Sequence, residues 1–462
     1  MEDSEDEEDI VVRFFTDIGD DNDDEEEEEQ EKPSGPRAYF QDLGLMAEAA
    51  ADMPVDFLTD PEKAYYYLGR EEGGGREGGM KTCRLITGTW QLDGRHGYHP
   101  FFVDVKETVR DMVRRDGYTT FDVAPFYGQV ERWLGEVRTK IEDPMELEAY
   151  KIFTKLSFPP DQADYRLCDV EAAVDAALFR LRAPQLDLIQ LHWWDFDDPR
   201  YLDVLFHLEE LKLKGKVRHI GVTNFGASPL QRAIESGVRI VSNQVQYSLI
   251  DQRVRTVKLR ARLEGGQEEE EAMEDEDGKK DEDDPSRGAR ARPMISLADV
   301  CVRQNVSLLC YGTLLGGFLS ERWIGVPEPD PRAFTSTSEE KYWEILRTWG
   351  SWENFQMLLL ELRAIARKHR ASVALVALRW VLDQPGVGSV IVGTRLGYID
   401  HLEENKNVLK LALTAQDREN LERAVREGGR EMGDVVGDVG VEYKRAVMEV
   451  EEKYVQRSDR EY

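Results

Sequence analysis

Short apolar runs alternate with longer amphipathic segments through most of the chain. Several of these runs are apolar at nearly every position, which is typical of parallel strands that are buried on both faces. Between them, apolar residues recur at the three- and four-residue spacing of helices. The predicted strands are residues 83–90, 119–122, 150–155, 186–192, 217–224, 240–247, 306–312 and 388–393.

The alternation of strand and helix predicts the fold. Helices are predicted at residues 104–115, 169–182, 202–214, 353–370, 372–383 and 414–425. Eight strands that each precede a helical segment are typical of a (β/α)8 TIM barrel, which is an α/β fold. No GxGxxG motif opens a helix after an early strand, so a doubly wound dinucleotide-binding fold has no support.

Charge divides the chain into regions. It has 462 residues and a formal net charge of −32, and the excess acid is clustered within 20–31 and 268–271. Such segments repel themselves and bury little apolar area. The prediction is an acidic, mostly disordered N-terminal region at 1–79 and a barrel at 80–428. A low-complexity, charged insertion is predicted at 264–293 and a C-terminal tail at 429–462. Deleting the N-terminal region, or replacing the insertion with a short Gly-Ser loop, is expected to leave activity largely intact.

Composition also excludes some partners and locations. Nucleic acid and anionic membranes repel a strongly acidic chain, so neither is an expected partner. No run is long enough to span a membrane, and the acidic start is unlike a signal peptide. The four cysteines show no metal-ligand spacing, so no metal site is expected. Scattered thiols are typical of a reducing compartment and predict a cytoplasmic protein.

Candidate chemistry is concentrated at the ends of predicted strands. Asp122 ends the second strand, and Tyr127 follows on the loop after Pro125. Lys155 ends the third strand and His192 ends the fourth. The carboxyl ends of all strands meet on one face of a TIM barrel, where its active sites are built. These four side chains are therefore expected to share one site.

The order of these motifs resembles the aldo-keto reductase superfamily. The DxxxxY block from Asp122 to Tyr127, Lys155, and Leu191-His192-Trp193 carry the resemblance. It implies reduction of a small-molecule aldehyde or ketone by NADPH. Carbonyl reduction needs a hydride and a proton, and the implied proton donor is Tyr127. Its free pKa is about 10, and the ammonium of Lys155 would lower it. Asp122 would hold Lys155, and His192 would orient the carbonyl.

The resemblance also implies a set of cofactor-binding residues. One group, which includes Asp122, would surround the nicotinamide, with Tyr311 stacked on its ring and amides gripping its carboxamide. A second group would bind the phosphates and adenosine. Arg395 suits a 2′-phosphate, but no second Lys or Arg lies between Gly393 and Asn405, so NADH is also possible. The two groups are Gly88, Thr89, Trp90, Asp122, Thr223, Asn224, Gln244 and Tyr311, and then Gly312, Leu314, Gly316, Gly393, Thr394, Arg395, Glu404 and Asn405.

The sequence predicts less about the substrate pocket than about the cofactor site. Residues 318–352 form a second insertion, rich in Pro, Trp and charge, which the active-site face is expected to carry. Aromatic side chains near the strand ends and on this insertion are candidates for the pocket wall, with core packing as the alternative. The candidates are Trp90, Phe126, Trp193, Trp194, Trp349 and Trp352.

Alternative interpretations stay open. Lys155 could be a surface residue beyond the strand end, and His192 a core histidine. A lysine at a barrel strand end could also form a Schiff base, as in aldolases, although Tyr127, His192 and the nicotinamide-type motifs favour reduction. A different class of function is a cofactor-binding, redox-sensing regulatory subunit with little turnover, like the potassium-channel β-subunits of the same superfamily. The sequence leaves the oligomeric state open.

Overall fold

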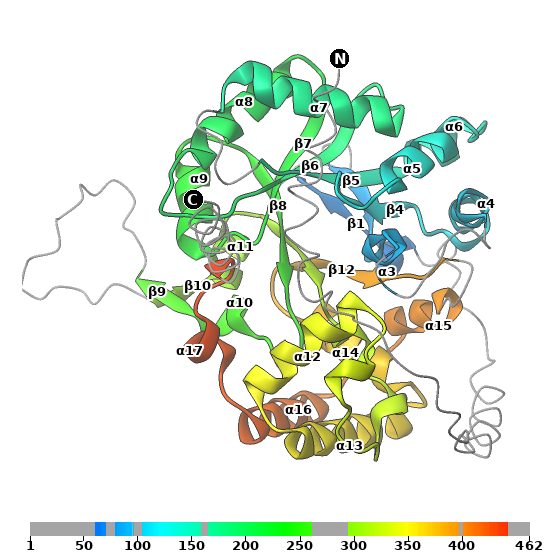
Figure 1. Cartoon of the computed structure of the whole chain (residues 1–462), viewed down its shortest axis with the longest axis vertical. Helices are drawn as coiled ribbons and strands as arrows, with labels where there is room; N and C mark the ends of the chain where they lie inside the picture. The colour runs from blue at the N-terminus through cyan, green and yellow to red at the C-terminus, as the bar shows by residue number, and fades with distance from the viewer. Residues whose placement is uncertain are drawn as a thin grey trace, which may run out of the picture.

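The computed structural model describes residues 61–70, 79–94, 96, 104–158, 165–260, 294–396 and 401–441. Eight parallel strands close into a barrel at its centre, in the order β11-β12-β3-β4-β5-β6-β7-β8 (Figure 1). The strands are β3 (Leu85–Gly88), β4 (Thr120–Asp122), β5 (Lys151–Leu156), β6 (Leu186–His192), β7 (Val217–Thr223), β8 (Ile240–Gln246), β11 (Ser307–Tyr311) and β12 (Val387–Gly393).

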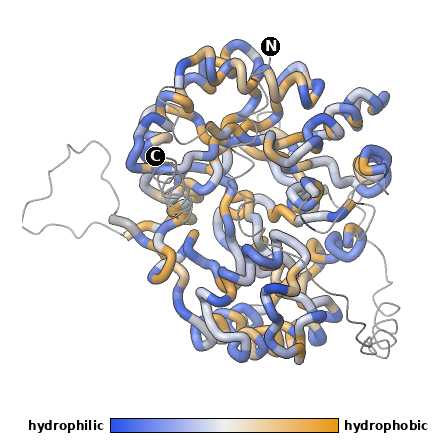
Figure 2. The backbone as a smooth tube through the Cα atoms, in the orientation of Figure 1, coloured by the Kyte–Doolittle hydropathy of each residue, from blue (hydrophilic) through white to orange (hydrophobic). Residues whose placement is uncertain are grey.

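Helices surround the barrel. Figure 2 shows hydrophilic and hydrophobic positions alternating along them, as expected for helices with one buried face. The predicted (β/α)8 fold is thus confirmed. The helices are α3 (Pro61–Ala64), α4 (Val105–Asp111), α5 (Val130–Arg138), α6 (Pro144–Ala149), α7 (Leu167–Leu181), α8 (Tyr201–Leu213), α9 (Ala227–Glu235), α10 (Arg253–Thr256), α11 (Leu297–Arg303), α12 (Thr337–Trp349), α13 (Trp352–His369), α14 (Val373–Leu382), α15 (Leu402–Lys406), α16 (Ala415–Gly428) and α17 (Met432–Val436).

An N-terminal hairpin closes the barrel at the end opposite the strand C-termini. β1 (Tyr65–Leu68) pairs antiparallel with β2 (Met80–Cys83). The hydroxyl of Tyr65 donates to the carbonyl of Gly117, before β4, and Arg239, before β8, donates to the carbonyl of Gly69. Leu68 is fully buried in a cluster that includes residues of β3, β5, β6 and β8. The described structure therefore includes residues 61–70, within the N-terminal region that the sequence predicted to be mostly disordered.

This hairpin revises the expectation that everything before Met80 is dispensable. Removing residues 1–60 should leave folding and activity intact, whereas removing 1–79 also deletes β1 and should destabilise the barrel. Leu68→Ala should lower the free energy of unfolding by about 2–5 kcal/mol, because it leaves a cavity in the core. Urea unfolding measures the change. Leu213, which is 88% exposed on α8, is the matched control, and a Leu68→Ala cost equal to that of Leu213→Ala would contradict the packing role of β1.

The two predicted insertions differ in what the structure shows of them. Residues 261–293 lie outside the described residues, but the strands that flank them, β9 (Lys258–Arg260) and β10 (Met294–Ser296), pair antiparallel. The chain therefore leaves and re-enters the domain at one place. The later insertion, residues 318–352, is folded. It contains α12, which contacts the loop after β11 at a 3-10 turn, η6 (Leu315–Gly317).

The C-terminal region after the barrel is partly described. α16 is longer than the predicted helix at 414–425, and α17 lies within the predicted C-terminal tail. The remainder of the predicted tail, from residue 442, lies outside the described residues. Within the part of the chain that is described, no helix has the length and apolar character needed to cross a membrane.

Candidate active site

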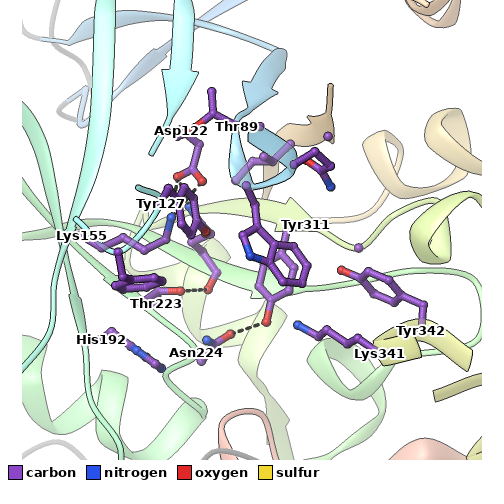
Figure 3. A pocket seen from close by; sticks show the side chains of 18 residues that line it. Thr89, Asp122, Tyr127, Lys155, His192, Thr223, Asn224, Tyr311, Lys341 and Tyr342 are labelled. Atoms are coloured by element: carbon purple, nitrogen blue, oxygen red, sulfur yellow. Dashed lines mark hydrogen bonds and ion pairs between the residues drawn. The ribbon is translucent and has the colours of Figure 1, made fainter. Parts of the chain in front are cut away.

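A cleft opens at the carboxyl ends of the barrel strands (Figure 3). The space within it is about 820 Å³, which includes open solvent at its mouth. Every barrel strand contributes at least one lining residue, as expected for the catalytic face of this fold. The residues contributed at or near the strand ends are Gly88, Asp122, Lys155, His192, Thr223, Gln244, Tyr311 and Gly393.

A buried ion pair lies in the cleft. The Nζ atom of Lys155, on β5, is 2.9 Å from Oδ2 and 3.1 Å from Oδ1 of Asp122, the last residue of β4. It also donates to the backbone carbonyl of Val123 at 3.2 Å. The side chains of both partners are nearly inaccessible to solvent, so Lys155 is not the surface residue of the alternative interpretation. Parallel pairing of β4 with β5 places these two strand ends side by side.

Tyr127 lies on the loop between β4 and α5, next to this pair. Its ring centroid is 5.1 Å from Nζ of Lys155, and the side chain is half-buried. The loop is anchored on both sides. Asp122 ends the strand before it, and Glu131, in the first turn of α5, accepts a hydrogen bond from Thr154 of β5 and pairs with Arg180 of α7. The position of the tyrosine is thus set by contacts between α5 and the barrel.

His192 lies at the end of β6 and lines the same cleft. Burial, together with the nearby positive charges of Lys155 and Lys341, lowers its pKa to about 3. The imidazole is therefore neutral near pH 7. The centroid of its ring is 4.4 Å from that of Trp194, and the two rings are tilted by 55°. A neutral imidazole donates one N–H and is a poor source of a proton.

Amide side chains cover the floor of the cleft. Gln244 donates to Asp122 Oδ1 at 2.6 Å and to Gln190 Oε1 at 3.1 Å. Asn224 has a left-handed backbone, with φ of 59°, and its Oδ1 accepts from the hydroxyl of Tyr311 at 3.0 Å. This hydrogen bond holds the hydroxyl end of the Tyr311 ring, which Figure 3 shows beside Asn224. The floor therefore combines neutral hydrogen-bonding groups with one oriented aromatic face.

The structure brings most of the predicted site residues together. All four proposed catalytic residues line the cleft, and so do ten of the predicted cofactor residues: Gly88, Thr89, Trp90, Asp122, Thr223, Asn224, Gln244, Tyr311, Gly312 and Gly393. The other predicted cofactor residues are outside its lining. Leu314 and Gly316 follow β11, Thr394 and Arg395 follow β12, and Glu404 and Asn405 lie on α15.

The predicted aromatic wall is only partly correct. Trp90 and Phe126 line the cleft. Trp193 and Trp194 are buried in packing beside it, with their indole N–H groups donating to backbone carbonyls. Trp349 and Trp352 do not reach it.

The last two tryptophans pack inside the folded insertion. Trp349 is 1% exposed and lies against Gly428 and Gly429. Trp352 stacks among the rings of Trp323, Trp343 and Phe355. Both are therefore packing residues: Trp349, at the end of α12, and Trp352, at the start of α13, are buried among other elements and not in the cleft.

Several residues of the site were not predicted from the sequence. Gln190 lies two positions before His192 on β6, and strand periodicity places both side chains on the same, inward face. That spacing was a usable signal. Gln91, Ile391, Lys341 and Tyr342 also line the cleft. The last two come from α12, and the approach of this helix to the barrel mouth depends on tertiary packing.

Comparison with known proteins agrees with this geometry. The model of the "Aldo/keto reductase family" matches residues 84–262 and 290–426, which is more than half of the chain. The chain therefore belongs to the aldo/keto reductase family.

Relatives of known name are distant in sequence. The oxidoreductase Mb2320 of Mycobacterium bovis, described as uncharacterized, is 26% identical over 75% of this chain and 90% of its own. The aldo-keto reductase str7 of Strobilurus tenacellus is 25% identical over 68% of this chain and 79% of its own. Flagellar radial spoke protein 5 of Chlamydomonas reinhardtii is 26% identical over 56% of this chain. The match spans about half of that protein, 49% of its length. The family, and the relatives named as an oxidoreductase and as a reductase, support a general oxidoreductase.

Solved structures share the fold. The thermostable aldo-keto reductase Tm1743 has a TM-score of 0.51 and 22% identity, and the match covers 78% of this chain and 99% of that one. The glycerol dehydrogenase AKR11B4 of Gluconobacter oxydans has a TM-score of 0.53 and 20% identity, over 81% of this chain and 97% of that one. At these identities the likeness concerns the fold alone.

Proposed function

We propose that the chain reduces aldehydes or ketones to alcohols with NADPH, and that Tyr127 donates the proton. One observation carries the proposal. The Lys155–Asp122 ion pair lies next to the Tyr127 ring, in a cleft whose histidine is neutral near pH 7. Of the side chains in this group, the tyrosine is the one suited to donate a proton while Lys155 stays positively charged.

The side chains and backbone groups that line the cleft suit a nicotinamide cofactor. A carboxamide-bearing ring needs a flat apolar face and neutral hydrogen-bonding partners, and Tyr311, Asn224 and Gln244 offer these side by side. Gly88, Gly312 and Gly393 present only backbone to the cleft. Arg395, just after β12, is half-buried and suits a 2′-phosphate. NADPH supplies the hydride when bound.

The protein's own groups then direct the proton. The N–H of the neutral His192 imidazole would donate to the substrate carbonyl oxygen and orient it toward Tyr127. As negative charge develops on that oxygen, the Tyr127 hydroxyl gives up its proton. The positive charge of Lys155 stabilises the phenolate that remains, because opposite charges attract strongly in a buried site. Asp122, with Gln244 bonded to it, keeps the ammonium in place.

NADPH binding should be independent of metal. Among the described residues, no group of three or more His, Cys, Asp or Glu side chains is arranged to hold a metal ion. Titration of the full-length protein with NADPH, followed by cofactor fluorescence, should saturate equally with and without a chelator. A panel of aldehydes and ketones should then oxidise the bound NADPH with formation of alcohol. Chelator-sensitive binding, or no binding of either NADPH or NADH, would contradict the proposed chemistry.

A further inference from the structure

The geometry points to Lys341 as the binding group for an anion carried by the substrate, which makes the preferred substrates carbonyl compounds with a carboxylate or phosphate group. This inference rests on the proposed function, because it names the substrate class of the same cleft. Lys341 comes from α12, in the insertion after β11. Figure 3 shows it on the side of the cleft opposite Lys155 and Tyr127.

Aromatic rings surround the ammonium of Lys341. Its Nζ atom is 5.2 Å from the ring centroid of Tyr311, 5.5 Å from that of Trp90 and 5.5 Å from that of Tyr342. Rings at these distances attract a cation through their π-electrons and limit the positions that the flexible lysine stem adopts. The ammonium is therefore held at the cleft and is only partly exposed.

The helix that carries Lys341 is fixed to the barrel mouth by neighbouring residues. Ser338 Oγ lies 3.1 Å from Nδ1 of His96, and Gln91 donates to the same hydroxyl. One turn further along, the Tyr342 ring lies against Gly312 and Gly316, both of which have positive φ and leave no room for a side chain there. Lys341 lies between these two anchors, so its position depends on α12 as a whole.

The charges that line the cleft favour an anion. Asp122 is the one carboxylate among the lining residues, and Lys155 neutralises it. Because His192 is neutral near pH 7, Lys341 leaves the described lining with a net positive charge. The whole chain carries −32, which would repel an anionic substrate at long range. Salt screens that repulsion beyond about 8 Å, so a local cation decides binding.

The placement of these residues in the cleft defines the ligand further. The carbonyl must reach Tyr127 and His192, while the anion reaches across the cleft to Lys341. The ligand between them contacts Trp90 and the other rings, so an aromatic or aliphatic spacer fits. An aromatic aldehyde with a carboxylate para to the carbonyl carries the two groups at opposite ends of such a spacer. A phosphate at the same place would satisfy the same cation.

A matched pair of substrates tests the inference in the full-length enzyme. Wild type should reduce 4-carboxybenzaldehyde with a kcat/KM about 10-fold or more above that of 4-methylbenzaldehyde, since a hydrogen bond to a charged group contributes at least that factor. Lys341→Met keeps the apolar stem and should remove the preference, whereas Lys341→Arg should retain much of it. Arg347→Met is the control, because Arg347 lies on the same helix, pairs with Glu328 and is not part of the cleft lining.

The NADPH dissociation constant separates the two sources of an anion. If Lys341 binds the substrate, the constant stays unchanged in Lys341→Met and only the carboxylate substrate is affected. If Lys341 binds the diphosphate of NADPH, the NADPH dissociation constant rises and kcat/KM falls equally for both aldehydes. That result overturns the inference. The inference is also overturned if the wild type has nearly the same kcat/KM for 4-carboxybenzaldehyde and 4-methylbenzaldehyde.

A second readout does not depend on turnover. In calorimetry, benzoate should bind the NADPH complex of the wild type. Its affinity for the NADPH complex of Lys341→Met should be lower by a factor of about 10 or more. Equal binding of benzoate by both proteins overturns the anion site. Wild type that binds NADPH and benzoate, but reduces neither aldehyde, contradicts the proposed function and leaves the anion site supported.

Discussion

Replacing Tyr127 by Phe should slow turnover by about 10² to 10⁴-fold, the usual effect of losing a positioned acid. The substitution removes one hydroxyl and little volume, so folding and NADPH binding should survive. kcat on the best aldehyde and the NADPH dissociation constant, measured on the same preparation, separate the two properties.

The control for this substitution removes a hydroxyl elsewhere. Tyr67 is half-buried on β1 and is not part of the cleft lining, and Tyr67→Phe should leave kcat unchanged. If Tyr127→Phe binds NADPH and keeps near-normal kcat, then Tyr127 is a packing residue. The proton would in that case come from water or from His192, although the low pKa of His192 argues against the latter.

Lys155→Met should also slow turnover by a large factor, because the phenolate of Tyr127 would lose its stabilising cation. The double variant with Tyr127→Phe should be little slower than the slower of the two single variants, since both changes act on one proton transfer. Additive losses would mean that the two residues act in separate steps. Single-turnover rates with saturating NADPH measure these effects directly.

The stability of Lys155→Met must be measured alongside its activity. The substitution leaves the Asp122 carboxylate buried without its main partner, which typically costs about 3–5 kcal/mol. Adding Asp122→Asn removes that charge, and should restore most of the stability while turnover stays slow. If activity returns together with stability, the lysine has only a structural role.

Strand ends were the most predictable part of the molecule. β6 has the predicted bounds at both ends, and Asp122 and His192 end their strands as expected. An apolar run sets where a strand begins and ends, and a parallel barrel brings all carboxyl ends to one face. The strand ends and the parallel barrel together were enough to predict that Asp122, Lys155 and His192 lie in one site.

Residues outside the repeating pattern were less predictable. β1 precedes a glycine-rich segment, and its partner β2 joins almost directly to β3, so a local pattern gave no sign of the hairpin. The wrong placement of Trp349 in the pocket wall could have been avoided from the sequence. Tyr342, Leu346 and Trp349 recur at the spacing of one helix face and are all buried, which would have placed the tryptophan in the core of a helix at 337–349. The approach of Lys341 to the cleft depends on tertiary packing of α12 and had no local signal.

One measurement tests the proposed reaction most directly: the fate of a deuteride from 4-deuterated NADPH in a single turnover with a carbonyl substrate. The account predicts that deuterium appears on the carbinol carbon of the alcohol, at a rate that falls about 10² to 10⁴-fold in Tyr127→Phe. If wild type binds the labelled NADPH tightly but transfers no deuterium to any aldehyde or ketone of a broad panel, the account is contradicted. The redox-sensing subunit would then be the better description of this chain.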